Sequence, residues 1–350
     1  MRKSDLNSQL ENCNFIKTIL MLLVVLYHSC ALWKSGGWFN QAPANPSAFL
    51  DILAQWLNSF HVYGFTLVSG FIFYSLKNEK GKYQDRKAFV ISKMKRLIVP
   101  YVLVSTLWAG PWYVYYFKAS LGDVLKNFVL GVQPAQLWFL LMLFWVLVIA
   151  IILPDKLYDS FIVLLIVSLV LYGIGFVGGM LIPNVLQVFT GCQYFIFFAL
   201  GCIIAKELSG DETSISKIHT LFRNPIWMIF LDIAIFAVYM LLGTLNLAVF
   251  KLVRLCVEAI LHVVGALMAF SVLKWIANRV DWKKNSVFML LSKHNFMIYL
   301  LHQQIIYGVI TLFNGKVASG VLVALNFVGS VLITLLLAIV IERLLKQKER

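Results

Sequence analysis

The sequence predicts an all-α, polytopic membrane bundle with about ten transmembrane helices. Of its 350 residues, 61% are hydrophobic, and the mean hydropathy is +0.83, whereas soluble domains contain about 45–50% apolar residues. The apolar residues form long unbroken runs rather than an alternating pattern, which favours helices over a β-barrel. In hydrocarbon every backbone polar group must be hydrogen-bonded inside the protein, so such runs cross as helices.

Ten runs approach or exceed the roughly 20 apolar residues that cross a bilayer. We expect a single membrane domain over residues 1–350 with no separate soluble domain, because no long polar stretch interrupts the runs. The first run follows a long mixed segment that contains Asp5 and Glu11, so it is predicted to be an uncleaved span rather than a signal peptide. The predicted spans are about 14–34, 52–76, 97–117, 135–153, 159–181, 186–206, 225–243, 247–274, 287–312 and 320–342.

The distribution of lysine and arginine predicts the orientation of these spans. With the N-terminus inside, most cations, including the cluster from Lys77 to Arg96, fall in cytoplasmic segments, as the positive-inside rule expects. Both termini are therefore predicted to be cytoplasmic. The formal net charge of +14 then reflects loops that face anionic lipid, and no nucleic-acid partner is expected. The outer loops hold only Lys34, Lys118, Lys126 and Lys316.

The five cysteines are scattered along the chain and show no metal-ligand spacing. They are interpreted as small apolar residues, and no metal is expected.

The first span carries a lysine near one end and a histidine inside it. Lys17 and His28 are eleven residues apart, which is three helical turns plus about 20°, so both lie on one face about 16 Å apart. His28 is either a packing histidine or part of a functional site, and Lys17 either extends to the headgroups or binds a ligand.

The third span begins with a basic pair in the segment SKMKRLIVPY. Lys93 and Arg96 are three residues apart and are expected on one face at the cytoplasmic end. They either anchor lipid phosphates or capture a phosphate-rich cytosolic ligand.

The eighth span contains a polar stripe in the segment KLVRLCVEAILHVVG. Lys251, Arg254, Glu258 and His262 are spaced by three, four and four residues, which places them along one helix face. Arg254 and Glu258 are expected to form an ion pair, either structural or functional, because an unpaired buried charge is costly.

The ninth span contains His302 in the segment FMIYLLHQQ, at a depth similar to that of His28 in the first span and His61 in the second. Several histidines at one level of a bundle suggest a polar chamber.

These segments together resemble the integral membrane acyltransferases of acyltransferase family 3, over nearly the whole chain. Lys17 and Lys93 stand where that family usually has Arg, and Gln136 stands where it often has His. The second span contains FTLVSGFIFY, in which Ser69 and Gly70 are interpreted as a close-approach surface between helices rather than as a nucleophile. The remaining matches are Arg96 with Pro100 and Tyr101, Leu137–Leu140, Tyr299 with Leu300 and His302, and Glu342 with Arg343.

The resemblance implies a multi-pass enzyme of a bacterial plasma membrane that moves an acyl group, commonly acetyl, from cytosolic acyl-CoA to a hydroxyl of a cell-surface polysaccharide or other glycan precursor. It implies His28 as the general base, by direct transfer or through an acyl-histidine. The donor phosphates would bind Lys17, Lys93 and Arg96. The residues expected to bind substrate are Arg254, Glu258, His302 and Trp138.

A transporter or flippase for a lipid-linked sugar is the main alternative, because it would also place polar and aromatic residues in the membrane. No internal repeat of the kind common in transporters is visible, which favours the acyltransferase.

Overall fold

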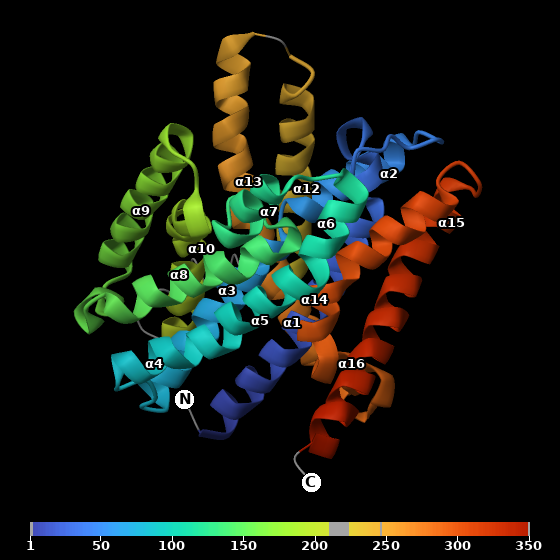
Figure 1. Ribbon diagram of the computed structural model, residues 1–350. Helices are drawn as coiled ribbons and strands as arrows, with labels where there is room; N and C mark the ends of the chain where they lie inside the picture. The colour runs from blue at the N-terminus through green and yellow to red at the C-terminus, as the bar shows by residue number, and fades with distance from the viewer. Residues whose placement is uncertain (1–2, 210–223, 246, 349–350) are drawn as a thin grey trace. The chain divides into compact units, whose positions relative to one another are not determined.

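The computed structural model describes residues 3–209, 224–245 and 247–348, and these are helical apart from connecting loops and one isolated bridge between Trp38 and Gln41 (Figure 1). The α-helices are α1 (Lys3–Cys30), α2 (Ala48–Asn58), α3 (His61–Tyr74), α4 (Arg86–Lys93), α5 (Val99–Val104), α6 (Gly110–Phe117), α7 (Leu121–Val124), α8 (Trp138–Ile152), α9 (Phe161–Leu181), α10 (Val188–Ser209), α12 (Pro225–Leu242), α13 (Ala248–Ala277), α14 (Ser286–Phe313), α15 (Ser319–Ala324) and α16 (Ser330–Lys348).

Ten helical segments in the described ranges are long and apolar enough to cross a membrane, so the prediction of a multi-pass helical membrane protein is confirmed. Their orientation, with both termini cytoplasmic, stays a prediction. The segments are Leu6–Gly36, Ala48–Glu79, Arg86–Phe117, Ala135–Ile152, Phe161–Leu181, Val185–Ser209, Pro225–Leu242, Ala248–Ala277, Ser286–Phe313 and Ser319–Leu344.

The second and third spans are less regular than the sequence suggested. The second consists of two helices, α2 and α3, separated at Ser59 and Phe60. The third contains π-helical turns at 94–98 and 105–109, each just before a proline. Pro100 and Pro111 lack an N–H and crowd the carbonyl four residues earlier, so the helix widens at each proline. The N–H of the residue before each proline bonds five residues back, from Val99 to the Met94 carbonyl and from Gly110 to the Ser105 carbonyl.

The chain divides into two compact units, each built from three segments. The first unit contains residues 1–17, 59–100 and 138–280, and the second contains residues 18–58, 101–137 and 281–350. Helix α1 therefore contributes Lys17 to the first unit and His28 to the second.

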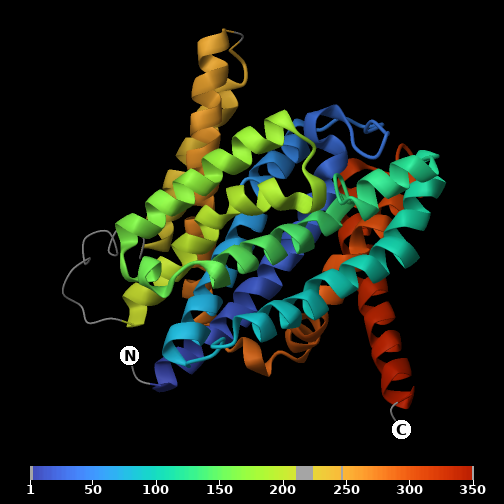
Figure 2. The same cartoon turned by 60° about the vertical axis from the view of Figure 1, so that its left-hand side comes forward.

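Close packing of α3 against α10 forms the centre of the first unit. A Cβ atom built on Gly70 would lie 1.9 Å from the carbonyl oxygen of Phe198, and one on Gly201 would lie 1.9 Å from that of Leu67. Only glycine allows such an approach, so the prediction that Gly70 serves helix contact is confirmed. Helix α9 packs on α10, and α13 packs on α3 and α12 (Figure 2).

The second unit is organised around α14, which packs along α16. Several hydrogen bonds tie the loop after α1 to the end of α14, and two of the shortest involve Asn314. The side chain of Asn314 accepts a hydrogen bond from the backbone N–H of Ala44 (3.0 Å) and donates one to the carbonyl of Ala42 (2.9 Å). These bonds hold the loop at the C-terminal end of α14, and the rings of Trp38 and Phe39 in the same loop lie 4.8 and 4.1 Å from that of Tyr307.

Candidate functional site

Two histidines from distant parts of the sequence meet inside the second unit. His28 on α1 and His302 on α14 have their ring centroids 5.0 Å apart, and His302 Nε2 lies 3.0 Å from His28 Nδ1. His302 is fully buried, and His28 is partly exposed. This contact agrees with the expectation for His28 and His302, whereas His61 belongs to the first unit and the shared depth of the three histidines stays a prediction.

The surrounding carbonyl oxygens determine which ring nitrogens carry protons. His302 Nδ1 lies 2.7 Å from the carbonyl of Tyr299, and His28 Nδ1 lies 3.0 Å from that of Val24. A carbonyl only accepts, so both Nδ1 atoms carry hydrogen. His28 Nδ1–H therefore shares its hydrogen between Val24 and His302 Nε2, which must accept. His302 is therefore neutral in this arrangement, and the neutral form of His28 carries its lone pair on Nε2.

An aromatic layer lies against the imidazole pair. The Trp38 ring is 5.6 Å from that of His28 and 4.8 Å from that of Tyr307. Trp38 opens a two-residue turn in which Phe39 and Asn40 have φ values of 59° and 52°. This left-handed conformation costs about 1–2 kcal/mol per residue outside glycine, and Phe39 offsets that cost by stacking on Tyr307 at 4.1 Å. Sequence reasoning missed this turn, whose signal is the Gly36-Gly37 pair before it.

Gln136 forms a buried polar junction with α14. Its side-chain amide exchanges two hydrogen bonds with Gln304, at 2.8 and 3.1 Å, and also donates to the carbonyl of Leu300 at 2.8 Å. The Tyr299 hydroxyl donates to the Gln136 carbonyl. Because Tyr299 also supplies the carbonyl that orients His302, the junction and the imidazole pair belong to one network.

The basic residues predicted in the first and third spans gather in the first unit. Lys17 is close enough to Arg96 for their charges to interact, and so is Lys93. The Lys93 ammonium lies over the rings of Tyr83 and Phe89, at 5.3 and 4.8 Å. Burial raises the pKa of Tyr83, against the opposing effect of Arg96, so this phenol stays a hydrogen-bond donor.

A fourth cation, Lys274 at the last turn of α13, belongs to the same group of basic residues. Both Lys274 and Lys17 interact electrostatically with Cys13. Close to this point the side-chain amide of Asn12 donates a hydrogen bond of 2.6 Å to the side-chain oxygen of Asn278. Sequence reasoning counted Lys274 only among the loop cations, because nothing local distinguishes it from its neighbours. We call Lys17, Lys93, Arg96 and Lys274 the basic cluster.

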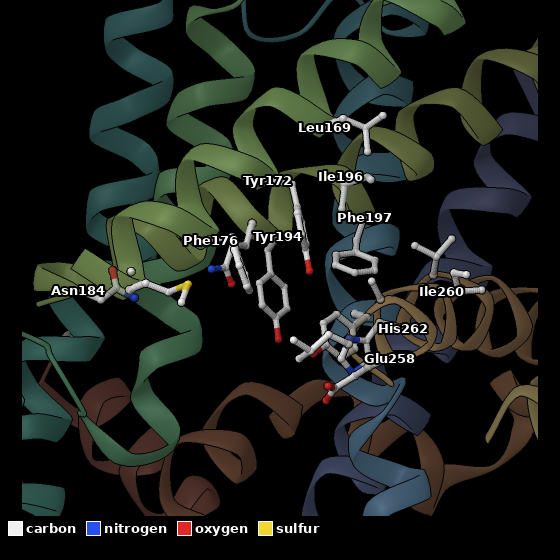
Figure 3. Close-up of a pocket in the computed structure, with 17 residues that line it drawn as sticks. Leu169, Tyr172, Phe176, Asn184, Tyr194, Ile196, Phe197, Glu258, Ile260 and His262 are labelled. Carbon is white, nitrogen blue, oxygen red and sulfur yellow. The ribbon is translucent and has the colours of Figure 1, made fainter. Parts of the chain in front are cut away.

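The first unit also contains a cavity of about 670 Å³ lined by α3, α9, α10 and α13 (Figure 3). Glu258 and His262 of the predicted stripe both line it. His262 stacks on Tyr63 at 4.0 Å, and Tyr63 stacks on Tyr194 at 4.9 Å. Trp138 lies behind this column, with its ring 5.5 Å from that of Tyr194.

The expected ion pair between Arg254 and Glu258 is absent among the described residues. The guanidinium of Arg254 instead lies 4.3 Å from the centroid of the Tyr239 ring, on the neighbouring helix α12. A planar guanidinium gains cation–π energy there, which leaves the Glu258 carboxylate at the cavity.

A fully buried acid, Asp232 on α12, was missed by sequence reasoning. A Cβ atom on Gly265 of α13 would lie 3.1 Å from its Oδ1, so glycine makes room for the carboxylate. The signal was available, because a single acid within the apolar run WMIFLDIAIF is unusual in a membrane helix.

No group of three or more His, Cys, Asp or Glu side chains suited to a metal ion occurs in the part of the chain that the structure describes. The profile of a family described as "Acyltransferase domain" matches residues 10–343. No curated protein and no solved structure matches the chain.

Proposed function

Because the chain belongs to acyltransferase family 3, we propose that it moves an acyl group from cytosolic acyl-CoA to a hydroxyl of a cell-surface polysaccharide or other glycan precursor. Acetyl is the expected acyl group, and the plasma membrane of a bacterium is the expected location. The observation that supports this chemistry best is the imidazole pair, in which the lone pair of His28 lies on Nε2.

His28 is the proposed general base. Its Nε2 takes the proton of the acceptor hydroxyl while the hydroxyl oxygen attacks the thioester carbonyl carbon. A new C–O ester bond forms and the C–S bond breaks. The departing CoA thiolate then takes the proton from the imidazolium, which returns His28 to its starting state. An acyl-histidine would use the same nitrogen as nucleophile.

His302 is proposed to position His28 rather than to bind substrate. Its Nε2 can only accept from His28 Nδ1–H, because its own Nδ1–H is engaged by backbone carbonyls. His302 thus resembles the residue that orients the catalytic histidine in Ser-His-Asp hydrolases. It also stabilises the imidazolium that forms when His28 accepts a proton, since Nδ1–H then becomes a stronger donor.

The basic cluster is the proposed site for the donor phosphates. Charge interactions among Lys17, Lys93 and Arg96 disfavour their convergence unless an anion offsets them, and a nucleotide with several phosphates supplies that charge. Placement of this cluster at the cytosolic side follows the orientation predicted from the charge distribution. Glu258, Arg254 and Trp138 are proposed on the acceptor side.

Purified protein in vesicles tests the central role of His28. His28→Ala is expected to bind acyl-CoA normally and to lose transfer by about 10²–10⁴-fold, the usual contribution of a general base. His294→Gln, at a histidine of α14 that contacts Glu342, is the matched control and should keep activity. Full transfer by His28→Ala would remove the assignment.

Release of free CoA distinguishes the two function classes. An acyltransferase consumes thioester in proportion to acceptor, whereas a flippase for a lipid-linked sugar would move substrate across the membrane without releasing any thiol. Thiol release that depends on both acceptor and His28 would exclude the transporter.

A further inference from the structure

The cavity of the first unit differs in polarity between its interior and its rim. Tyr172, Tyr194, Gln193, Glu258 and His262 contribute polar atoms to its lining (Figure 3). The rim contains apolar side chains from two helices that lie in candidate membrane spans. These rim residues are Leu169 and Met180 of α9, with exposed fractions of 53% and 72%, and Leu255 and Ile260 of α13, with 51% and 53%.

The composition of the rim indicates that a ligand enters the cavity from the lipid bilayer rather than from water. Apolar side chains exposed at membrane depth contact lipid tails, which are as apolar as leucine. Helix α9 packs along α10, and α13 packs along α3 and α12, so the rim between α9 and α13 borders lipid. A ligand that enters there must itself be partly dissolved in the bilayer.

The interior shows which headgroup fits. The Glu258 carboxylate makes no hydrogen bond or ion pair with the described residues, and it lines the cavity. None of the seventeen lining residues is lysine or arginine, so an anionic phosphate would meet a negative wall. Neutral hydroxyls can donate to the carboxylate and to the glutamine oxygen, and accept from the tyrosines.

The aromatic column adds a surface that suits a sugar ring. Tyr63 stacks between the rings of His262 and Tyr194, and Phe197 lies 4.7 Å from it. Flat aromatic faces beside hydrogen-bonding groups suit a ring with an apolar face and a polar edge. The cavity volume of about 670 Å³ lies in the range of small-molecule sites.

We propose that this cavity binds the neutral carbohydrate headgroup of a membrane lipid, which enters sideways from the bilayer between α9 and α13. The inference rests on the proposed function in one respect: the lipid-borne carbohydrate is the acyl acceptor. Glu258 fixes the headgroup through its hydroxyls, and the exposed residues of α9 and α13 contact the alkyl chain.

Photolabelling tests the binding directly. The protein in phosphatidylethanolamine and phosphatidylglycerol vesicles is exposed to an alkyl β-glucoside that carries a diazirine in its chain, and labelled peptides are mapped by mass spectrometry. Probes with the same chain and a phosphate or an ammonium headgroup serve as comparison. We expect the glucoside to label α9 and α13 and unlabelled glucoside to compete. Equal labelling by all three probes, or labelling elsewhere, would overturn the inference.

Two variants separate headgroup recognition from entrance. Glu258→Gln should lower glucoside labelling about tenfold, as expected when a hydrogen bond to a charged group is lost, while Glu79→Gln, at an exposed acid, should not. Ile260→Trp should block the rim, whereas Ile174→Trp, equally exposed on α9 but outside the cavity lining, should not. Unchanged labelling in both Glu258→Gln and Ile260→Trp would contradict the proposal.

Acyl transfer to the alkyl glucoside is measured in parallel. Glu258→Gln should raise the KM for the glucoside and leave the KM for acyl-CoA unchanged. If His28-dependent transfer to other hydroxyl acceptors persists while the cavity takes no label, the lipid-borne acceptor is wrong and the acyltransferase stands. If the cavity is labelled but His28 proves dispensable, the binding of the lipid headgroup stands and the assignment of His28 as the base is wrong.

Discussion

Replacing His302 offers a quantitative test of the imidazole pair. His302→Phe keeps a ring in a fully buried position but removes the Nε2 acceptor for His28. His28 Nδ1–H would still donate to Val24 at 3.0 Å, so the correct tautomer is retained. The variant therefore loses orientation and charge stabilisation, while the proposed base itself remains.

The magnitude follows from the single contact that is lost. The hydrogen bond strengthens from about 0.5–1.5 kcal/mol with a neutral donor to about 1.5–3 kcal/mol with a charged one when His28 takes the proton, a gain of about 1 kcal/mol, and each 1.36 kcal/mol changes a rate tenfold. His302→Phe should therefore lower kcat about fivefold, far less than the roughly 10²–10⁴-fold expected for His28→Ala. His302→Gln, whose side-chain oxygen can accept the same hydrogen, should recover part of the loss.

The assay is single-turnover release of free thiol from saturating acyl-CoA and acceptor, with a thermal unfolding curve for each variant. The KM for acyl-CoA should not change, because His302 makes no proposed contact with the donor. A loss as large as that of His28→Ala would mean that His302 itself reacts. An unchanged kcat would mean that the contact between the rings does not orient the base.

Three further predictions concern packing, the donor and the polar junction. Gly70→Ala should destabilise the protein by at least about 1–3 kcal/mol because its methyl group meets the Phe198 carbonyl, whereas Gly173→Ala, which meets nothing within 4 Å, should not; thermal melting checks both. Lys274→Ala should raise the KM for acyl-CoA about tenfold with kcat retained, and an effect confined to the acceptor would contradict its place in the basic cluster. Gln136→Leu should lower stability by about 1–3 kcal/mol per polar group left unpaired, and an unchanged melting temperature would show that the junction is dispensable.

Much of the fold followed from local patterns. Runs of apolar residues located the ten candidate spans found in the described ranges, because hydrocarbon thickness fixes the length of a crossing helix. The spacing of Glu258 and His262 placed both on one face of α13, and both line the same cavity. Such predictions succeed because the helical period alone decides which residues share a face, whatever elements pack against the helix.

Contacts between distant segments could not be predicted in the same way. Lys274 looked like any loop cation until α13 brought it near Cys13. Arg254 had an acidic partner one turn away, yet it lies over Tyr239 of α12. In each case the deciding neighbour is more than ten residues away in the chain, so no local period reveals it.

Lys17 and Lys93 stand where the family usually has arginine. The consequence of this change for phosphate binding also depends on distant neighbours. An arginine holds a phosphate with a planar two-point fork, and a lysine offers a compact point charge on a flexible stem. Taken without their neighbours, Lys17 and Lys93 would therefore bind a phosphate more weakly than two arginines. In the basic cluster they act beside Arg96 and Lys274, so several point charges converge on one ligand. If that convergence compensates for the missing forks, Lys93→Arg should change the KM for acyl-CoA only slightly when Lys274 is present. It should recover affinity in the Lys274→Ala background, and a failure of that recovery would show that the two positions bind the donor independently.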